Sequence, residues 1–411
     1  MKNTAALLLA CLALAAPARA GGFSSGGSIK TYLYSLEPAN VRNYPLPQPD
    51  GPYAVSENKL RLKTFWDSGS GLKAEAAYEL VYTARKAELA EARPLAAGYG
   101  YRVSDPDPFL SPASGGERGS SALLQNLDRA FLTWSPAAFD LYAGRQALAF
   151  GSGRSVNPTD VLAPYPYGTI DTEERRGVDA LRLKLPWREM GELDAGWLPG
   201  ESWRPADGAG FIRARGVFRN TDITLLSAAF RGNLLAGADI ERNFGGAALR
   251  AEGAQVWAGT FQDRRPAEDF FRLTAGAEYN FGLLGGTDAW LEYHYNGAGA
   301  AGTAAYSSRA ASTAYTEAGV YLLGRHYLAG GAGAQLSPLV SAGASALVNL
   351  GDGSFYAMPS LEWNAAENLY LSAGALLPAG QRATFSGLAA SPSSEFGLYG
   401  RSFYASLRKY F

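Results

Sequence analysis

Most of the chain alternates between apolar and polar residues with a period of two. In residues 271–281 the odd positions carry Phe, Leu, Ala, Ala, Tyr and Phe, whereas the even positions carry Arg, Thr, Gly, Glu and Asn. Successive side chains of a β-strand point to opposite faces, so this pattern predicts a strand with one apolar and one polar face. The same alternation recurs at 60–66, 72–82, 179–185, 212–218, 289–295, 340–350, 355–363 and 369–375.

With weaker segments included, the pattern predicts about 18 strands of roughly 9–11 residues, the length that crosses a lipid bilayer at a tilt. A barrel of 16 strands is the alternative. The expected strands begin near residues 29, 59, 72, 123, 138, 178, 192, 210, 222, 234, 247, 270, 288, 325, 339, 355, 368 and 398.

The segments that connect these strands alternate in length. Those after even-numbered strands are short, at 68–70, 135–137, 187–191, 219–221, 243–246, 282–287, 337–338 and 365–367. Most of those after odd-numbered strands are longer, at 37–58, 83–122, 150–177, 297–324 and 378–396. Short turns at one rim and long loops at the other are typical of a transmembrane antiparallel β-barrel, with both termini on the periplasmic side. A large soluble β-sandwich is the alternative fold.

The amino-terminal residues predict export. Lys2 precedes an apolar run over residues 5–16, and Ala18-Arg19-Ala20 forms a small-x-small cleavage site, so residues 1–20 are expected to be a signal peptide. A lipoprotein signal that uses Cys11 is the alternative. The expected organisation is then a short periplasmic lead over 21–28 and an outer-membrane barrel over 29–411. Cys11 is the only cysteine, so the exported chain has no disulfide.

Two segments resemble parts of known bacterial barrels. Residues 398–411 end in Phe411 and resemble the closing strand by which outer-membrane barrels are recognised for assembly. Residues 144–160 begin Gly-Arg-Gln and continue into a Gly-rich turn, as in alginate-export-like and porin-like proteins. This resemblance implies a channel in the Gram-negative outer membrane, reached through the periplasm. The implied partners are the barrel-assembly machinery, outer-membrane lipid and lipopolysaccharide.

If the apolar face meets lipid, the charged residues of the other face line the lumen. The early and middle strands then contribute the basic residues Arg61, Lys63, Arg182, Lys184, Arg213 and Arg215. Later strands contribute the acidic residues Asp239, Glu241, Glu252, Glu278 and Glu292. Because these two groups lie across the ring from each other, we expect one basic and one acidic wall that orient solutes and filter ions. The alternative is that these charges merely keep the interior wet.

The long connection over 150–177 is a candidate constriction loop. Its charged residues are Arg154, Asp160, Asp171, Glu173, Glu174, Arg175 and Arg176, and Pro158, Pro164 and Pro166 restrict its backbone. Such a loop can hold charges at fixed positions inside a barrel. An ordinary extracellular loop is the alternative.

Composition then excludes several functions. The formal net charge is −1, so no basic surface for nucleic acid is expected. The two histidines, His294 and His326, have no partner at metal-ligand spacing, and no nucleophile-elbow motif is present. We therefore expect no metal, no cofactor and no enzymatic activity.

The predicted function is passive or facilitated diffusion of small hydrophilic solutes, such as saccharides or small organic ions. There are two alternatives. One is a plugged structural or adhesion barrel whose outer loops bind a ligand, and the other is an outer-membrane hydrolase. The pattern leaves the oligomeric state and the solute open.

Overall fold

A computed structural model of the chain describes residues 21–411 apart from 50, 86–99, 112–119, 165–168, 263–267, 284 and 387–388. The predicted signal peptide, residues 1–20, lies outside the described residues. No helix in the described part is long and apolar enough to cross a membrane.

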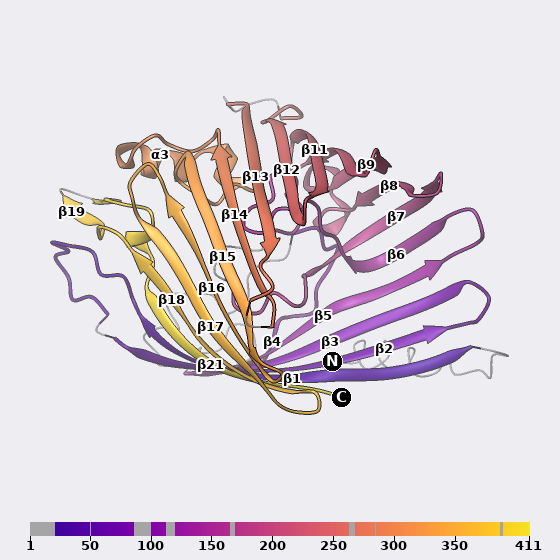
Figure 1. Cartoon of the computed structure of the whole chain (residues 1–411), viewed down its shortest axis with the longest axis horizontal. Coiled ribbons are helices and arrows are strands. Elements are labelled where there is room, and N and C mark those ends of the chain that lie inside the picture. The colour runs from indigo at the N-terminus through magenta and orange to yellow at the C-terminus, as the bar shows by residue number, and fades with distance from the viewer. Residues whose placement is uncertain are drawn as a thin grey trace.

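Among the described residues, eighteen strands close into one antiparallel barrel (Figure 1). The ring consists of β1 (Gly22–Glu37), β2 (Tyr53–Asp67), β3 (Leu72–Arg85), β5 (Ser121–Trp134), β6 (Asp140–Ala147), β7 (Gly177–Trp187), β8 (Gly191–Leu198), β9 (Ala209–Phe218), β10 (Thr221–Phe230), β11 (Asn233–Phe244), β12 (Ala247–Trp257), β13 (Phe270–Asn280), β14 (Thr287–Asn296), β15 (His326–Ser337), β16 (Val340–Asn349), β17 (Phe355–Ala366), β18 (Leu369–Ala379) and β21 (Arg401–Tyr410). β1 pairs with β2 on one side and with β21 on the other, which closes the ring. The prediction of about 18 strands is confirmed, and the alternatives of 16 strands and of a β-sandwich are wrong.

The remaining elements are short and lie in or beside the connections. They are β4 (Phe109–Ser111), which pairs with β5, the hairpin β19 (Thr384–Ser386) and β20 (Ala389–Ser391), and the helical turns η1 (Glu201–Trp203), η2 (Pro205–Asp207), η3 (Thr303–Ala305), α3 (Tyr306–Ala310), α4 (Thr313–Thr316) and η4 (Phe396–Leu398). The termini of the ring lie at the end of the barrel with the short turns: Gly22 pairs with Asp67, and Tyr410 N–H donates to Asn368 O.

The first strand begins earlier than predicted. β1 starts at Gly22 rather than at Ile29, and residues 22–28 pair with residues 61–67 of β2. Residues 22–28, expected as a lead before the barrel, therefore belong to the barrel itself. Their sequence is Gly and Ser apart from Phe23 and does not alternate, but backbone pairing needs no side-chain pattern.

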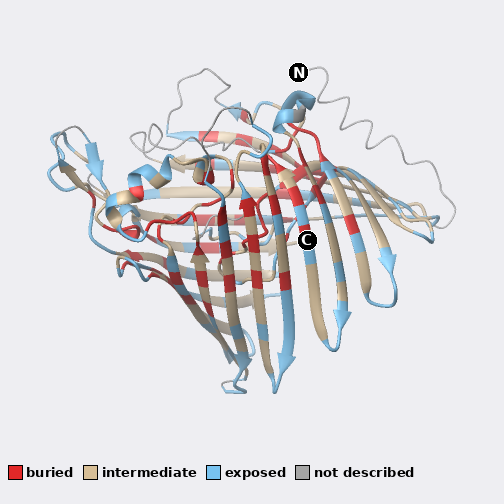
Figure 2. Cartoon of the chain, turned by 90° about the horizontal axis from the view of Figure 1, so that it is seen from above, coloured by how far each residue is buried: buried red, intermediate tan, exposed pale blue. Residues whose placement is uncertain are grey.

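The outer surface of the ring is apolar. Leu62, Leu132, Leu181, Ile212, Leu225, Leu291 and Leu361 point outward and are 46–59% exposed. Burial alternates along the strands in Figure 2. The neighbours of these outward residues point inward, where other side chains and connections inside the barrel cover them. A continuous apolar outer face around a closed sheet is the surface that a lipid bilayer covers.

The interior is not polar throughout, contrary to expectation. At the long-loop end of the barrel, inward-facing apolar residues of β7–β13 include Phe211, Phe230, Leu235 and Val256, and all four are buried. They pack against Leu148, Phe150, Val161 and Leu162 of the connection between β6 and β7, and against Ala314, Ala318 and Val320 after α3. Apolar residues face inward here because folded connections, rather than water, cover them.

The outward orientation of Leu225 gives a test of this arrangement. Leu225→Arg places a charge on the apolar outer face midway along β10 and should lower the free energy of unfolding by about 2–4 kcal/mol. Thr224→Arg adds the same side chain to the inner face of the same strand and should cost much less. Denaturant titration of the protein in lipid vesicles measures both. Equal losses would contradict the assignment of the outer face.

Candidate functional site

The connection between β6 and β7 comprises residues 148–176. Its described parts, 148–164 and 169–176, enter the barrel and contact two of its walls. Its first part, residues 150–160, lies against β11–β14, which carry the predicted acidic residues. Residues 169–176 lie against β1, β2 and β21, which carry basic residues. We call this connection the inward loop.

Two buried carboxylates of the acidic wall hold the first part of the inward loop. Glu252 Oε1 accepts hydrogen bonds from Thr159 N–H and Thr159 Oγ1, both at 2.7 Å, and Glu252 Oε2 accepts one from Ser152 N–H at 3.1 Å. Glu292 accepts from Arg154 N–H at 2.7 Å and from Ser155 N–H and Oγ at 2.9 and 2.7 Å. Each carboxylate is 1% exposed and is satisfied by loop donors in place of water.

The neighbouring acidic residues complete this contact. Asp239 accepts a hydrogen bond from Ser152 Oγ at 2.6 Å. Glu278 forms ion pairs with Arg154 of the loop and with Arg250 of β12, the latter at 2.6 Å. Glu241 lies on the same face of β11 as Asp239. Both residues line a cavity of about 110 Å³ beside the loop.

The second part of the inward loop carries the opposite charge to the wall that it meets. Asp171 forms ion pairs with Lys30 and Lys59, both at 2.9 Å. Glu173 lies 2.8 Å from Lys30 Nζ and pairs also with Arg408. Glu174 pairs with Lys63, and lies 3.5 Å from Arg61. Five cations of β1, β2 and β21 thus face three carboxylates of the loop.

These ion pairs lower the pKa values of two carboxyl groups of the loop. Burial opposes ionisation of Asp171, but Lys59 and Lys30 outweigh it and hold the pKa of that carboxyl below its usual value. Burial likewise opposes ionisation of Glu173, yet Lys30, Tyr410 and Arg408 lower its pKa. Asp160 behaves differently: it pairs with Arg175, but burial among apolar residues raises the pKa of its carboxyl. Arg176 is exposed just before β7.

Several predicted basic residues are neutralised by their own neighbours rather than by the loop. Arg182 donates to Asp194 through two nitrogens at 2.8 and 2.7 Å. Lys184 lies 3.1 Å from Glu192, and Arg213 lies 2.9 Å from Asp194. The expected basic wall is therefore strongest on β1, β2 and β21, where Lys30, Lys59 and Arg408 were not among the predicted site residues.

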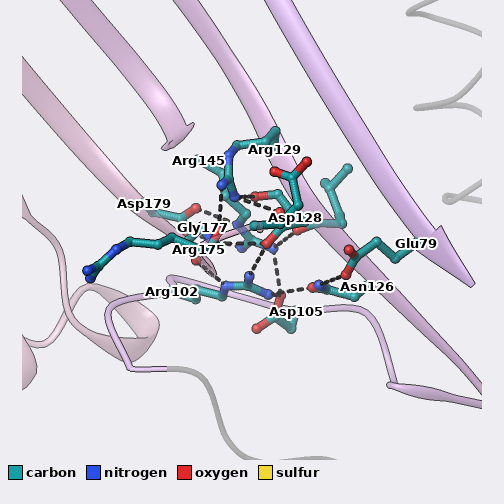
Figure 3. A network of polar contacts seen from close by, with 12 residues as sticks. Glu79, Arg102, Asp105, Asn126, Asp128, Arg129, Arg145, Arg175, Gly177 and Asp179 are labelled. Atoms are coloured by element: carbon teal, nitrogen blue, oxygen red, sulfur yellow. Dashed lines mark hydrogen bonds and ion pairs between the residues drawn. The ribbon is translucent and has the colours of Figure 1, made fainter. Parts of the chain in front are cut away.

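Arg145 is buried although strict alternation puts it on the lipid-facing side. The preceding residue, Gly144, has φ of 119°, and the pairing of β6 with β5 and β7 continues without a register shift through both residues. Arg145 is 5% exposed and donates from Nε to Asp179 at 2.8 Å, and it also pairs with Asp105 at 2.6 Å. Figure 3 shows this guanidinium inside a polar network that joins three strands and a connection.

A second irregularity brings Asp128 into the same network. On β5, Arg129 pairs with Ala77 and Leu127 pairs with Tyr78, which leaves Asp128 as an extra residue. Asp128 accepts a hydrogen bond from Gly177 N–H at 2.9 Å (Figure 3). It also lies 2.7 Å from Arg61, so it ties the end of the inward loop to β2. Sequence reasoning missed Asp128, Arg129, Arg102 and Asn126. The Asp-Arg pair inside an apolar strand was the available signal.

The two histidines have local partners. His294 Nδ1 lies 2.9 Å from Thr274 Oγ1 in the interior, and His326 Nδ1 lies 2.6 Å from Tyr293 OH. Within the described ranges, no three His, Cys, Asp or Glu side chains are placed to share a metal ion.

Comparison with known proteins supports the barrel. No protein-family model and no curated protein matches the chain. Among solved structures, Pseudomonas aeruginosa OpdK is 8% identical with a TM-score of 0.53, covering 95% of this chain and 98% of that one. P. aeruginosa OprD is 10% identical with a TM-score of 0.55 and 95% coverage of both chains. P. aeruginosa OccK7 is 9% identical with a TM-score of 0.54, covering 95% and 98%. The chain has the fold of these outer-membrane barrels.

Gly144 provides a test of the backbone conformation next to Arg145. A Cβ at Gly144 would lie 2.3 Å from Ala130 O, and its φ disfavours other residues. Gly144→Ala should therefore lower the free energy of unfolding by about 1–3 kcal/mol. Gly216→Ala is the matched control, since a Cβ at Gly216 has no atom within 4 Å. Denaturant titration compares the two, and a loss as small as that of the control would contradict backbone strain at Gly144.

Proposed function

We propose that the chain is a channel of the Gram-negative outer membrane through which small hydrophilic solutes pass by passive or facilitated diffusion. The observation that carries this proposal is the inward loop, which joins an acidic wall to a basic wall inside a closed barrel with an apolar outer face. Outer-membrane lipid, lipopolysaccharide and the assembly machinery are its proposed partners, and its termini are proposed to lie in the periplasm.

The electrostatics of the interior favour selection among solutes. Charges fixed on opposite sides of a water path, surrounded by low-dielectric walls, orient a solute and discriminate between ions. The loop side chains that contact both walls are the residues a passing solute would meet. One similar structure, that of P. aeruginosa OpdK, was determined with vanillate. Small organic ions, together with saccharides, are accordingly the solute classes that we propose.

Conductance of the purified protein in planar lipid bilayers tests the proposed function. Stepwise openings with a linear current–voltage relation are expected, because a fixed water path conducts ions in proportion to voltage. Persistent silence in several salts, with correctly folded protein in the bilayer, would contradict the channel and favour a barrel whose outer loops bind a ligand.

Release of the inward loop gives a second test. The triple variant Asp171→Asn, Glu173→Gln and Glu174→Gln leaves the facing cations of β1, β2 and β21 without their loop partners. The reversal potential in a salt gradient should shift toward anion preference, and the conductance should rise. The control removes three exposed carboxylates of other connections, with Asp207→Asn, Glu189→Gln and Glu201→Gln. An equal shift in the control would show that the loop carboxylates have no special role.

Acid should reproduce the effect of that triple variant. The pKa values of Asp171 and Glu173 are lowered in the folded protein, so their stabilisation is fully present above their ordinary pKa values and is lost as the pH falls through the lowered ones. Conductance should therefore be steady between about pH 5 and 8 and rise below about pH 4.

A further inference from the structure

A cavity of about 110 Å³ lies between the inward loop and the wall formed by β9, β10 and β11. Its lining includes Phe150 and Gly151 of the loop, Arg213 and Arg215 of β9, and Asp239 and Glu241 of β11. It is therefore bounded by two guanidinium groups on one side and by two carboxylates on the other.

The strand between these charges is neutral. β10 contributes Thr224 and Leu226 to the cavity, and the register aligns Arg215 with Thr224 and Thr224 with Asp239. Adjacent strands are about 4.8 Å apart, so the backbones that carry the opposite charges are separated by roughly 10 Å. No ion pair joins the two sides among the described residues, and the cavity occupies the space between them.

Of the two arginines, one is held by other residues of the protein and the other is available to a ligand. The same is true of the two carboxylates. Arg213 is fixed by Asp194 at 2.9 Å and lies over the Phe150 ring, and Asp239 accepts from Ser152 Oγ. Arg215, with its side chain 54% exposed, has only a 3.5 Å contact with Asp222 in the described part of the chain. Glu241 forms no ion pair with any residue that the structure describes.

We propose that this cavity binds a small zwitterion, with its carboxylate toward Arg215 and its ammonium group toward Glu241. The apolar part of the molecule would lie over Leu226 and Phe150. A singly charged ion is attracted by one side but repelled by the other, whereas a zwitterion forms a charge-assisted hydrogen bond at each end. This inference rests on the proposed channel function and names a solute class for it.

The binding test uses three probes with the same four-carbon chain. 4-Aminobutanoate carries both charges, butanoate carries only the negative one and butylammonium only the positive one. In planar bilayers, 4-aminobutanoate should interrupt the ion current of single channels at a concentration roughly tenfold lower than either singly charged probe, because it gains one more charge-assisted contact. Equal interruption by all three would overturn the site.

Charge reversals provide a switch in specificity. Arg215→Glu makes the cavity acidic and should transfer the preference to butylammonium. Glu241→Arg makes it basic and should transfer the preference to butanoate. The control is Glu75→Arg, a reversal on the inner face of β3 away from the cavity, which should keep the preference for 4-aminobutanoate. If both cavity variants also keep that preference, the proposed site is wrong.

Failure of the channel and failure of the site give different results. If the protein conducts no current, the proposed function fails, and titration calorimetry of the detergent-solubilised protein with the same three probes still tests the cavity. If the protein conducts but neither calorimetry nor current interruption distinguishes the zwitterion, the cavity proposal fails while the channel stands.

Discussion

Pairing of every backbone amide and carbonyl within the sheet is the constraint on which this structure depends. In hydrocarbon an unpaired peptide group has no water to bind, so a sheet that spans the bilayer must have no edge. Here β21 pairs with both β18 and β1, which removes the two edges of the ring. Closure also separates the two faces of each strand, since one face meets lipid and the other meets the interior. The charge pattern of the lumen is a consequence of this separation.

Inside the ring, charge complementarity decides where the inward loop lies. Its first part presents N–H and hydroxyl groups to Glu252 and Glu292, and its second part presents Asp171 to two lysines. Removing a single partner while the loop stays in place would leave a buried carboxylate or ammonium group unpaired, which costs far more than an exposed ion pair is worth. The apolar cluster around Phe211 supports the same position by covering the loop from the long-loop end.

Local departures from ideal strands prepare the site. Arg145, which follows the positive φ of Gly144, is buried in a polar network, and the extra residue Asp128 on β5 reaches both Arg61 and the end of the inward loop. The extra residue breaks the alternation of β5, which allows the adjacent charged residues Asp128 and Arg129 both to be buried in this network. A strand without the extra residue would point one of these two side chains toward lipid.

The amino-acid sequence determined the strands, their order around the ring and the position of the long connections, because a period of two and short turns are properties of neighbouring residues. It also placed Glu252, Glu292 and Asp171 on the interior or in the loop. Only the tertiary structure decided which charges form pairs. Asp171 and Lys30 are far apart in the chain, and the pattern of neighbouring residues contains no information about which distant residues come into contact. The start of β1 at Gly22 was likewise decided by its pairing with β2. Backbone hydrogen bonds form whatever the side chains are, so alternation of side chains does not reveal where such pairing begins.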